Sequence, residues 1–165
     1  MKLIIGIGNP GQQYKNTRHS AGYMVADALA SEISNSKSQI SNKSKILIFK
    51  SPNFMNDSGS FVKKLVDQYK LDLSDLYVIH DDLDIPFGSF KIQFGRGPKD
   101  HNGILDIEEK LGTKEFNRVR VGIDNRPQDN KPMGEVYTLE NFTDEEKEKL
   151  DNVIKEVCKK LVTSD

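Results

Sequence analysis

Apolar and polar residues follow one another in blocks that predict short buried strands separated by amphipathic helices. The apolar run Lys2–Gly8 leads into Asn9-Pro10-Gly11, a strong turn signal, so we expect a buried strand that delivers a loop. Apolar residues recur at helical spacing within Ala21–Ile33, which predicts an amphipathic helix. Ser34–Lys45 is rich in serine, asparagine and lysine without periodicity, and we expect a surface loop there.

The remaining elements follow from the same patterns. Ile46–Phe49 and the more apolar Leu76–His80 predict strands, and the alternation within Ser89–Phe94 predicts a half-buried one. The apolar residues of Ser58–Tyr69 share one helical face.

The last third of the chain predicts a helix, a strand and a long final helix. The helix Asn102–Leu111 is closed by Gly112, a residue type favoured just past a helix end. Val119–Ile123 follows as a strand. The final helix opens at Thr143 and runs to about Val162, with a glutamate three residues after the threonine in a capping-box pattern.

This order predicts one three-layer α/β/α domain over residues 1–165, with a mostly parallel mixed central sheet of the phosphorylase/hydrolase-like kind. Ligands bind beyond the carboxyl ends of strands in such sheets. The rule points to three loops after predicted strands: Asn9–Arg18, Ser51–Asp57 and Asp81–Pro86.

Composition sets the compartment and the partners that we expect. The chain is 36% hydrophobic and 30% charged, and its longest apolar runs are far short of the ~20 residues of a membrane span. Cys158 is the only cysteine, so an intrachain disulfide is impossible. No secretory h-region follows Met1. We therefore expect a cytoplasmic monomer without a membrane partner.

Charge is distributed unevenly along the chain. Residues 1–50 contain seven Lys/Arg and two acidic residues, Asp27 and Glu32, which gives a net charge of +5. Since the whole chain has a net charge of −1, residues 51–165 have a net charge of −6. This asymmetry permits a basic face that binds phosphates. The alternative is a solvated loop, since Lys37, Lys43 and Lys45 lie in one polar stretch.

The candidate catalytic base is a histidine. His19, His80 and His101 each lie in or next to a loop where we expect ligands, and histidine titrates near neutral pH. The alternative for any one of them is a buried structural ring or a surface residue. A base needs a carboxylate that orients it, and Asp81, at the end of an apolar strand, is the best placed.

Asp82 and Asp84 are alternative partners for the base, and the acidic run could instead bind a hard metal ion. We favour a metal-free site, because no other acidic cluster lies at a predicted strand end. Neither Ser20 nor Cys158 lies in a nucleophile elbow, so the natural attacking group is water activated by histidine.

Side-chain amides on the same loops can hold a substrate without adding charge. They belong to Asn9, Asn56 and Asn102, although turn chemistry alone would explain the first. The glycines of Gly6–Gly11 match G-x-G-x-x-G, but no helix opens there and no acidic residue ends a second strand ~20 residues on. We expect no nucleotide cofactor and no other cofactor.

Three blocks in the chain carry a resemblance to the bacterial peptidyl-tRNA hydrolase family. The first is Gly6–Gly11 with Tyr14 and Asn16–His19, the second is Phe54–Gly59, and the third is His80–Gly88, continuing to His101–Ile104. Together with Arg118–Ile123, they follow the order of the family. The resemblance implies hydrolysis of the ester that joins a peptide to the terminal ribose of tRNA, which recycles tRNA from aborted translation.

The resemblance also implies roles for single residues. His19 would activate water and Asp81 would orient it. Three asparagines would contact the peptide and the ester, and two aromatic rings would line the site for the tRNA end. These substrate-binding residues are Asn9, Tyr14, Phe54, Asn56 and Asn102. No metal is implied.

The chain departs from the family pattern at several positions. Ser20 replaces the usual asparagine after the base, Ser51-Pro52-Asn53 replaces the usual Pro-x-Thr, and Gly95–Asp100 replaces a glycine-rich loop. Gln93 replaces the lysine that, by the resemblance, would bind the tRNA phosphate. The candidate phosphate contacts are therefore Lys91, Arg96, Lys99 and Arg120.

Two other hypotheses compete with a peptidyl-tRNA hydrolase. The altered loop suggests a non-catalytic RNA-binding relative on the same fold, as occurs among organellar splicing cofactors. The presence of His19 and Asp81 with all three asparagines argues against it. The second reading is an unrelated small-molecule hydrolase or aminopeptidase-like enzyme, which a metal requirement or turnover of free peptides would favour.

Overall fold

A five-stranded sheet forms the centre of the computed structural model, which describes residues 1–35 and 45–163. The strand order is β2-β1-β3-β5-β4. All neighbouring strands are parallel except β4, which runs antiparallel to β5. The strands are β1 (Lys2–Gly6), β2 (Ile46–Lys50), β3 (Leu76–Pro86), β4 (Phe90–Phe94) and β5 (Asn117–Asp124).

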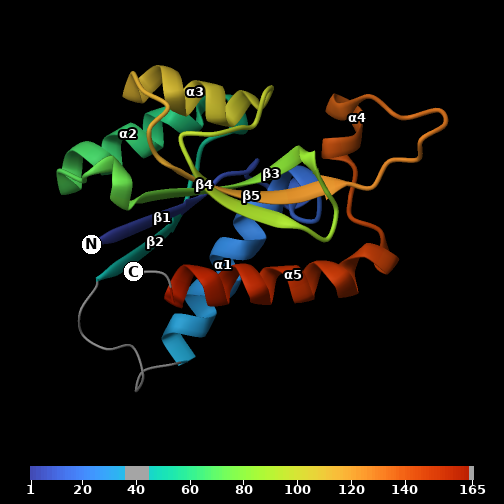
Figure 1. Cartoon of the computed structure of the whole chain (residues 1–165), viewed down its shortest axis with the longest axis horizontal. Helices are drawn as coiled ribbons and strands as arrows, with labels where there is room; N and C mark the ends of the chain where they lie inside the picture. The colour runs from blue at the N-terminus through green and yellow to red at the C-terminus, as the bar shows by residue number, and fades with distance from the viewer. Residues whose placement is uncertain (36–44, 164–165) are drawn as a thin grey trace.

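Helices cover both faces of this sheet, as Figure 1 shows, with α2 and α3 on one face and α1 and α5 on the other. A separate apolar core lies on each face. The three-layer fold with a mostly parallel mixed sheet is therefore confirmed. The helices are α1 (Ala21–Asn35), α2 (Ser58–Tyr69), α3 (Asn102–Leu111), α4 (Gly134–Leu139) and α5 (Asp144–Thr163). None of the helices in the described ranges is long and apolar enough to cross a membrane.

The predicted order of elements is correct, with differences at the ends of elements and one missed helix. The helix α4 was not predicted, and α1 extends into the segment expected to be a loop, through Ser34 and Asn35. The rest of that segment up to residue 44 lies outside the described residues. The final helix has the predicted capping box, in which Glu146 N–H donates to Thr143 Oγ1 (3.1 Å) and Thr143 N–H donates to Glu146 Oε1 (2.9 Å).

The prediction of a loop at Asp81–Pro86 is wrong, because β3 continues through this segment. Asp81 and Asp82 pair with β5, and the register shifts before Pro86. Their buried carboxylates accept hydrogen bonds from cationic or ring N–H groups of other elements, which offsets the cost of burying charge. The strand can therefore carry two aspartates into the interior.

Close packing brings the start of α1 against the sheet. A Cβ atom at Gly22 would collide with the carbonyl oxygens of Ile79 and Ile7, so only glycine permits this approach. The short 3-10 turn Arg18–Ser20 directly precedes α1. The approach therefore sets this turn beside the end of β3.

A buried cation fixes the same turn to the C-terminal part of the chain. Arg18 Nη2 donates to Glu146 Oε1 at 2.8 Å, and both side chains are buried. The guanidinium also stacks over the Tyr137 ring, 3.9 Å from its centroid. The turn before α1 is thus held by α4 and α5 as well as by the sheet.

Candidate active site

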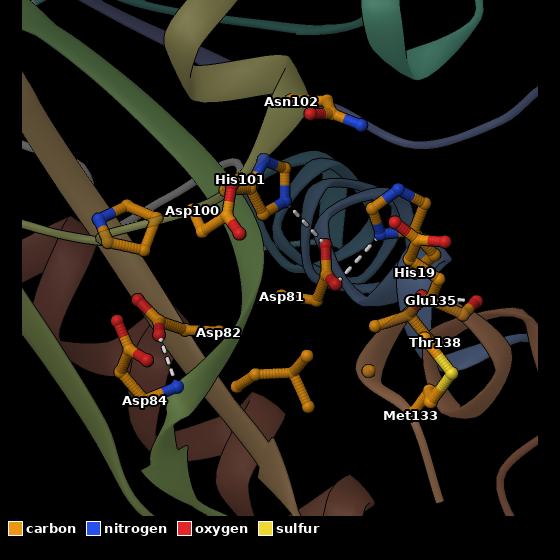
Figure 2. A pocket seen from close by; sticks show the side chains of 13 residues that line it. His19, Asp81, Asp82, Asp84, Asp100, His101, Asn102, Met133, Glu135 and Thr138 are labelled. Atoms are coloured by element: carbon orange, nitrogen blue, oxygen red, sulfur yellow. Dashed lines mark hydrogen bonds and ion pairs between the residues drawn. The ribbon is translucent and has the colours of Figure 1, made fainter.

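Two histidines share one buried carboxylate at the carboxyl end of the sheet. His19 comes from the turn before α1, Asp81 from β3, and His101 from the residue before α3. His19 Nδ1 lies 2.8 Å from Asp81 Oδ2, and His101 Nε2 lies 2.9 Å from Asp81 Oδ1. Figure 2 shows the two rings on opposite sides of the carboxylate, each facing its own oxygen.

The surroundings of His19 make it a stronger base than free histidine. Burial lowers its pKa, but the charge of Asp81 and the hydrogen bond to it outweigh burial, so the pKa of His19 is raised. The side chain of His19 stays 17% exposed. Because Nδ1 faces Asp81, Nε2 is the nitrogen left to receive a proton from water.

Asp81 remains ionised although it is almost fully buried. Burial raises its pKa, but the charges and hydrogen bonds of His19 and His101 together hold the pKa well below its usual range. An ionised carboxylate beside His19 can fix the ring tautomer and stabilise the imidazolium that forms during proton transfer.

The third histidine does not face this site as a base. His80 is fully buried, and its Nδ1 donates to the backbone oxygen of Asp81 at 2.7 Å. Burial, followed by the effect of His101, lowers the pKa of His80 to about 3. A group this hard to protonate is not a general base near neutral pH.

A groove of about 580 Å³ is lined by His19 and by all the predicted substrate residues except Tyr14. Asn9, Asn56 and Asn102 all line it together with Phe54, so these residues are brought together as the sequence predicts. Asn9 Oδ1 accepts a hydrogen bond from Met55 N–H at 2.8 Å, which leaves its amide N–H groups for a ligand.

Phe54 lines this groove, whereas Tyr14 does not line it and reaches it only through its contact with Phe54. The Tyr14 and Phe54 rings meet edge to face, with centroids 6.4 Å apart, and Phe54 is 54% exposed. An exposed ring of this kind offers a flat face on which a base can stack.

A second hollow, of about 320 Å³, shares His19 and Asn102 with this groove and is lined by the acidic end of β3 and by α4. Glu135 and Thr138 of α4 line both spaces. The sequence reasoning missed these residues because it missed α4. Met133, Val136 and Leu139 follow one another at helical spacing, but all three are exposed, so this pattern does not mark a buried helical face.

The four candidate phosphate contacts fall into two groups. Lys91, Arg96 and Lys99 are exposed. The side chain of Arg120 is only 11% exposed, and it donates to Asp82 Oδ2 and to Gln93 Oε1, both at 2.7 Å. Asp82 is therefore the partner of an arginine, and it is not the partner of His19.

Other reactive groups in the chain are poorly placed for catalysis. Cys158 is buried, and burial raises the pKa of its thiol to about 11, which disfavours the reactive thiolate. Ser20 is fully buried. In the described ranges, one group of side chains is compact enough to hold a metal ion: His19, Asp81 and His101, whose ligand atoms lie within 4.8 Å of one another.

Comparison with known proteins agrees with this geometry. Residues 3–164 match the family model described as peptidyl-tRNA hydrolase. Relatives with that name from Limosilactobacillus reuteri and Aliarcobacter butzleri are 40% and 41% identical; each comparison covers 94% of this chain, and 88% and 87% of the relatives. The crystal structure of peptidyl-tRNA hydrolase from Acinetobacter baumannii superposes with a TM-score of 0.79 at 26% identity, over 98% of this chain and 86% of that one.

Proposed function

The chain belongs to the peptidyl-tRNA hydrolase family, and we propose that it hydrolyses the ester of peptidyl-tRNA with a water molecule activated by His19. One observation carries the mechanism. His19 is held at 2.8 Å by the buried Asp81 and borders a groove lined by three asparagines. The same chemistry would recycle tRNA from stalled or aborted translation.

The proton moves in two steps. His19 Nε2 takes a proton from water while the water oxygen forms a bond to the ester carbonyl carbon, and Asp81 stabilises the imidazolium. The tetrahedral intermediate then breaks its bond to the ribose oxygen, which takes the proton back from His19. The products are a tRNA with a free terminal hydroxyl and a peptide with a free carboxyl group, which then releases its proton to solvent.

The groove supplies the remaining contacts in this proposal. Amide N–H groups of Asn9, Asn56 and Asn102 would donate to the peptide backbone and to the carbonyl oxygen as its negative charge grows. The rings of Tyr14 and Phe54 would stack with the bases at the tRNA end.

We also propose that this single-domain enzyme acts as a monomer in the cytoplasm, where translation forms its substrate. A metal-free mechanism is favoured because both oxygens of Asp81 already accept hydrogen bonds from His19 Nδ1 and His101 Nε2. Binding an ion there would break the contacts that orient His19.

The direct test is deacylation of N-acetyl-aminoacyl-tRNA by the purified chain. We expect multiple turnovers, at a rate that a chelator does not change. Monovalent salt keeps the tRNA folded in these assays. Binding without turnover would instead indicate an RNA-binding relative. Cleavage of free peptides, or loss of activity with the chelator, would indicate a different hydrolase.

The exposed cations near β4 are expected to bind tRNA phosphates, together with Arg120 if it leaves its present partners. Charge reversal at Lys91, Arg96 or Lys99 should raise KM for tRNA substrates. Each lost contact should also reduce the log–log salt slope by about 0.7–0.9, because bound cations release counterions from the nucleic acid.

A minimal ester without the tRNA body separates binding from chemistry, and its cleavage should be almost unchanged in these variants. Lys155→Glu is the matched control, since this lysine is exposed on α5 and lines neither hollow beside His19. If the reversals at Lys91, Arg96, Lys99 and Arg120 all behave like this control, the phosphate site lies elsewhere.

A further inference from the structure

The two rings on Asp81 differ in what their second nitrogen does. His19, which lines the groove, has its other nitrogen, Nε2, in no hydrogen bond within the described chain. His101 has its other nitrogen, Nδ1, at the start of α3, where it accepts a hydrogen bond from Ile104 N–H at 3.2 Å. His101 is therefore the N-cap of α3 as well as a partner of Asp81.

This cap fixes the tautomer of His101. An imidazole nitrogen that accepts from a backbone N–H must carry its lone pair there, so the ring proton lies on Nε2. That proton points to Asp81 Oδ1, 2.9 Å away. A proton added to Nδ1 would face the N–H of Ile104, donor against donor, and it would also lie near the positive end of the helix.

We propose that His101 is a positioning residue, whose ring donates a second hydrogen bond to Asp81 and whose role as the α3 cap directs the catalytic proton to His19. This inference rests on the proposed function and adds a residue to its machinery. Asp81 thereby bridges the base and the start of α3. Because α3 begins at Asn102, the same bridge fixes one of the groove asparagines relative to His19.

Other titratable groups lie around this bridge. His80 packs edge to face against His101, with ring centroids 5.0 Å apart, and its fully buried ring stays neutral. Asp100 precedes His101, and Glu135 of α4 lines both spaces beside His19. All of these groups are retained in the variants described next, so their influence is constant.

Two substitutions separate the two hydrogen bonds of the His101 ring. In His101→Asn, the side-chain oxygen is as many bonds from Cα as Nδ1, so it can cap α3 but cannot reach Asp81. In His101→Gln, the amide nitrogen is as many bonds from Cα as Nε2, so it can donate to Asp81 but does not cap the helix. The pair therefore distinguishes the donor from the cap.

We expect H101N to raise the midpoint of His19 protonation by about 0.5–1 pH unit, because Asp81 with one donor attracts the remaining proton more strongly. The kcat/KM should fall about three- to tenfold below the new midpoint and recover toward the wild-type value at high pH. H101Q should leave the midpoint in place but lower the Tm, because α3 loses its cap. A merely structural role for His101 would lower the rate equally at every pH.

NMR titration of the His19 ring gives the same midpoint without any turnover, in the wild-type protein and in both variants. An unchanged or lower midpoint in H101N would overturn the inference, and so would an equal shift in H101Q. Failure of the proposed function is a separate result, since it would appear as a wild-type protein that does not deacylate N-acetyl-aminoacyl-tRNA.

Discussion

Replacing His19 by alanine is expected to lower kcat for peptidyl-tRNA hydrolysis by about 10²–10⁴-fold, the usual effect of removing a general base. Substrate affinity should stay within a few-fold, because the asparagines and the aromatic pair that would hold the substrate are unchanged. Single-turnover deacylation measures the chemical step, and equilibrium binding of tRNA measures the affinity.

The fold should tolerate this change, because the turn that carries His19 is held by the neighbouring Arg18 through its buried contacts with Glu146 and Tyr137. An unchanged Tm in His19→Ala would therefore show that the loss is catalytic. If the variant keeps more than about a tenth of the wild-type rate, His19 is not the base.

The sequence predicted the sheet and most helices because their signals are local. The apolar residues of Leu76–His80 report burial directly, and the alternation within Ser89–Phe94 predicts a partly buried strand, although Phe94 at its end is 49% exposed. The continuation of β3 through Asp81–Pro86 could not be predicted in this way. An acidic run predicts a loop unless the hydrogen-bond donors to its carboxylates are known. The donors to Asp81 and Asp82 come from distant elements.

The helix α4 was missed for a different reason. It has six residues, and of these only Tyr137 and Thr138 are buried, while Val136 and Leu139 are exposed. A helix so short shows little of the periodicity on which sequence interpretation depends. That α4 lines both the groove and the hollow beside His19 therefore follows only from the three-dimensional structure.

In the candidate site, too, some roles follow from local sequence signals and others depend on contacts between distant elements. Asp81 was expected to orient a histidine because it ends an apolar strand, and the family resemblance selected His19 among the three histidines. The structure brings the two side chains into contact. The sequence makes His101 a candidate base, yet its contacts show that it caps α3 and donates to Asp81. Both contacts depend on the angle of α3 against β3, which no spacing in the sequence records.

Replacing Asp81 by asparagine should lower the rate and shift the pH–rate profile in a direction that the charges determine. His19 acts as a base only when it is unprotonated, so the rate rises with pH through the pKa of His19. Asp81 raises this pKa by its charge and its hydrogen bond. Removing the charge lowers the pKa, and the rising limb of the profile should move to lower pH.

The maximal rate should still fall, by about 10²–10⁴-fold, because an amide can donate to His19 Nδ1 and hold the ring in the tautomer that has no free lone pair toward water.

Asp84→Asn is the matched control. It makes the same chemical change in the neighbouring hollow, where the carboxylate accepts from Lys99 N–H and contacts neither histidine. Its midpoint should equal that of the wild type. H101N is expected to raise the midpoint of His19 protonation, whereas Asp81→Asn is expected to lower it. Such opposite shifts would assign Asp81 as the group that raises the pKa of His19, and His101 as a donor that weakens this effect. An unchanged profile in Asp81→Asn would remove Asp81 from the mechanism.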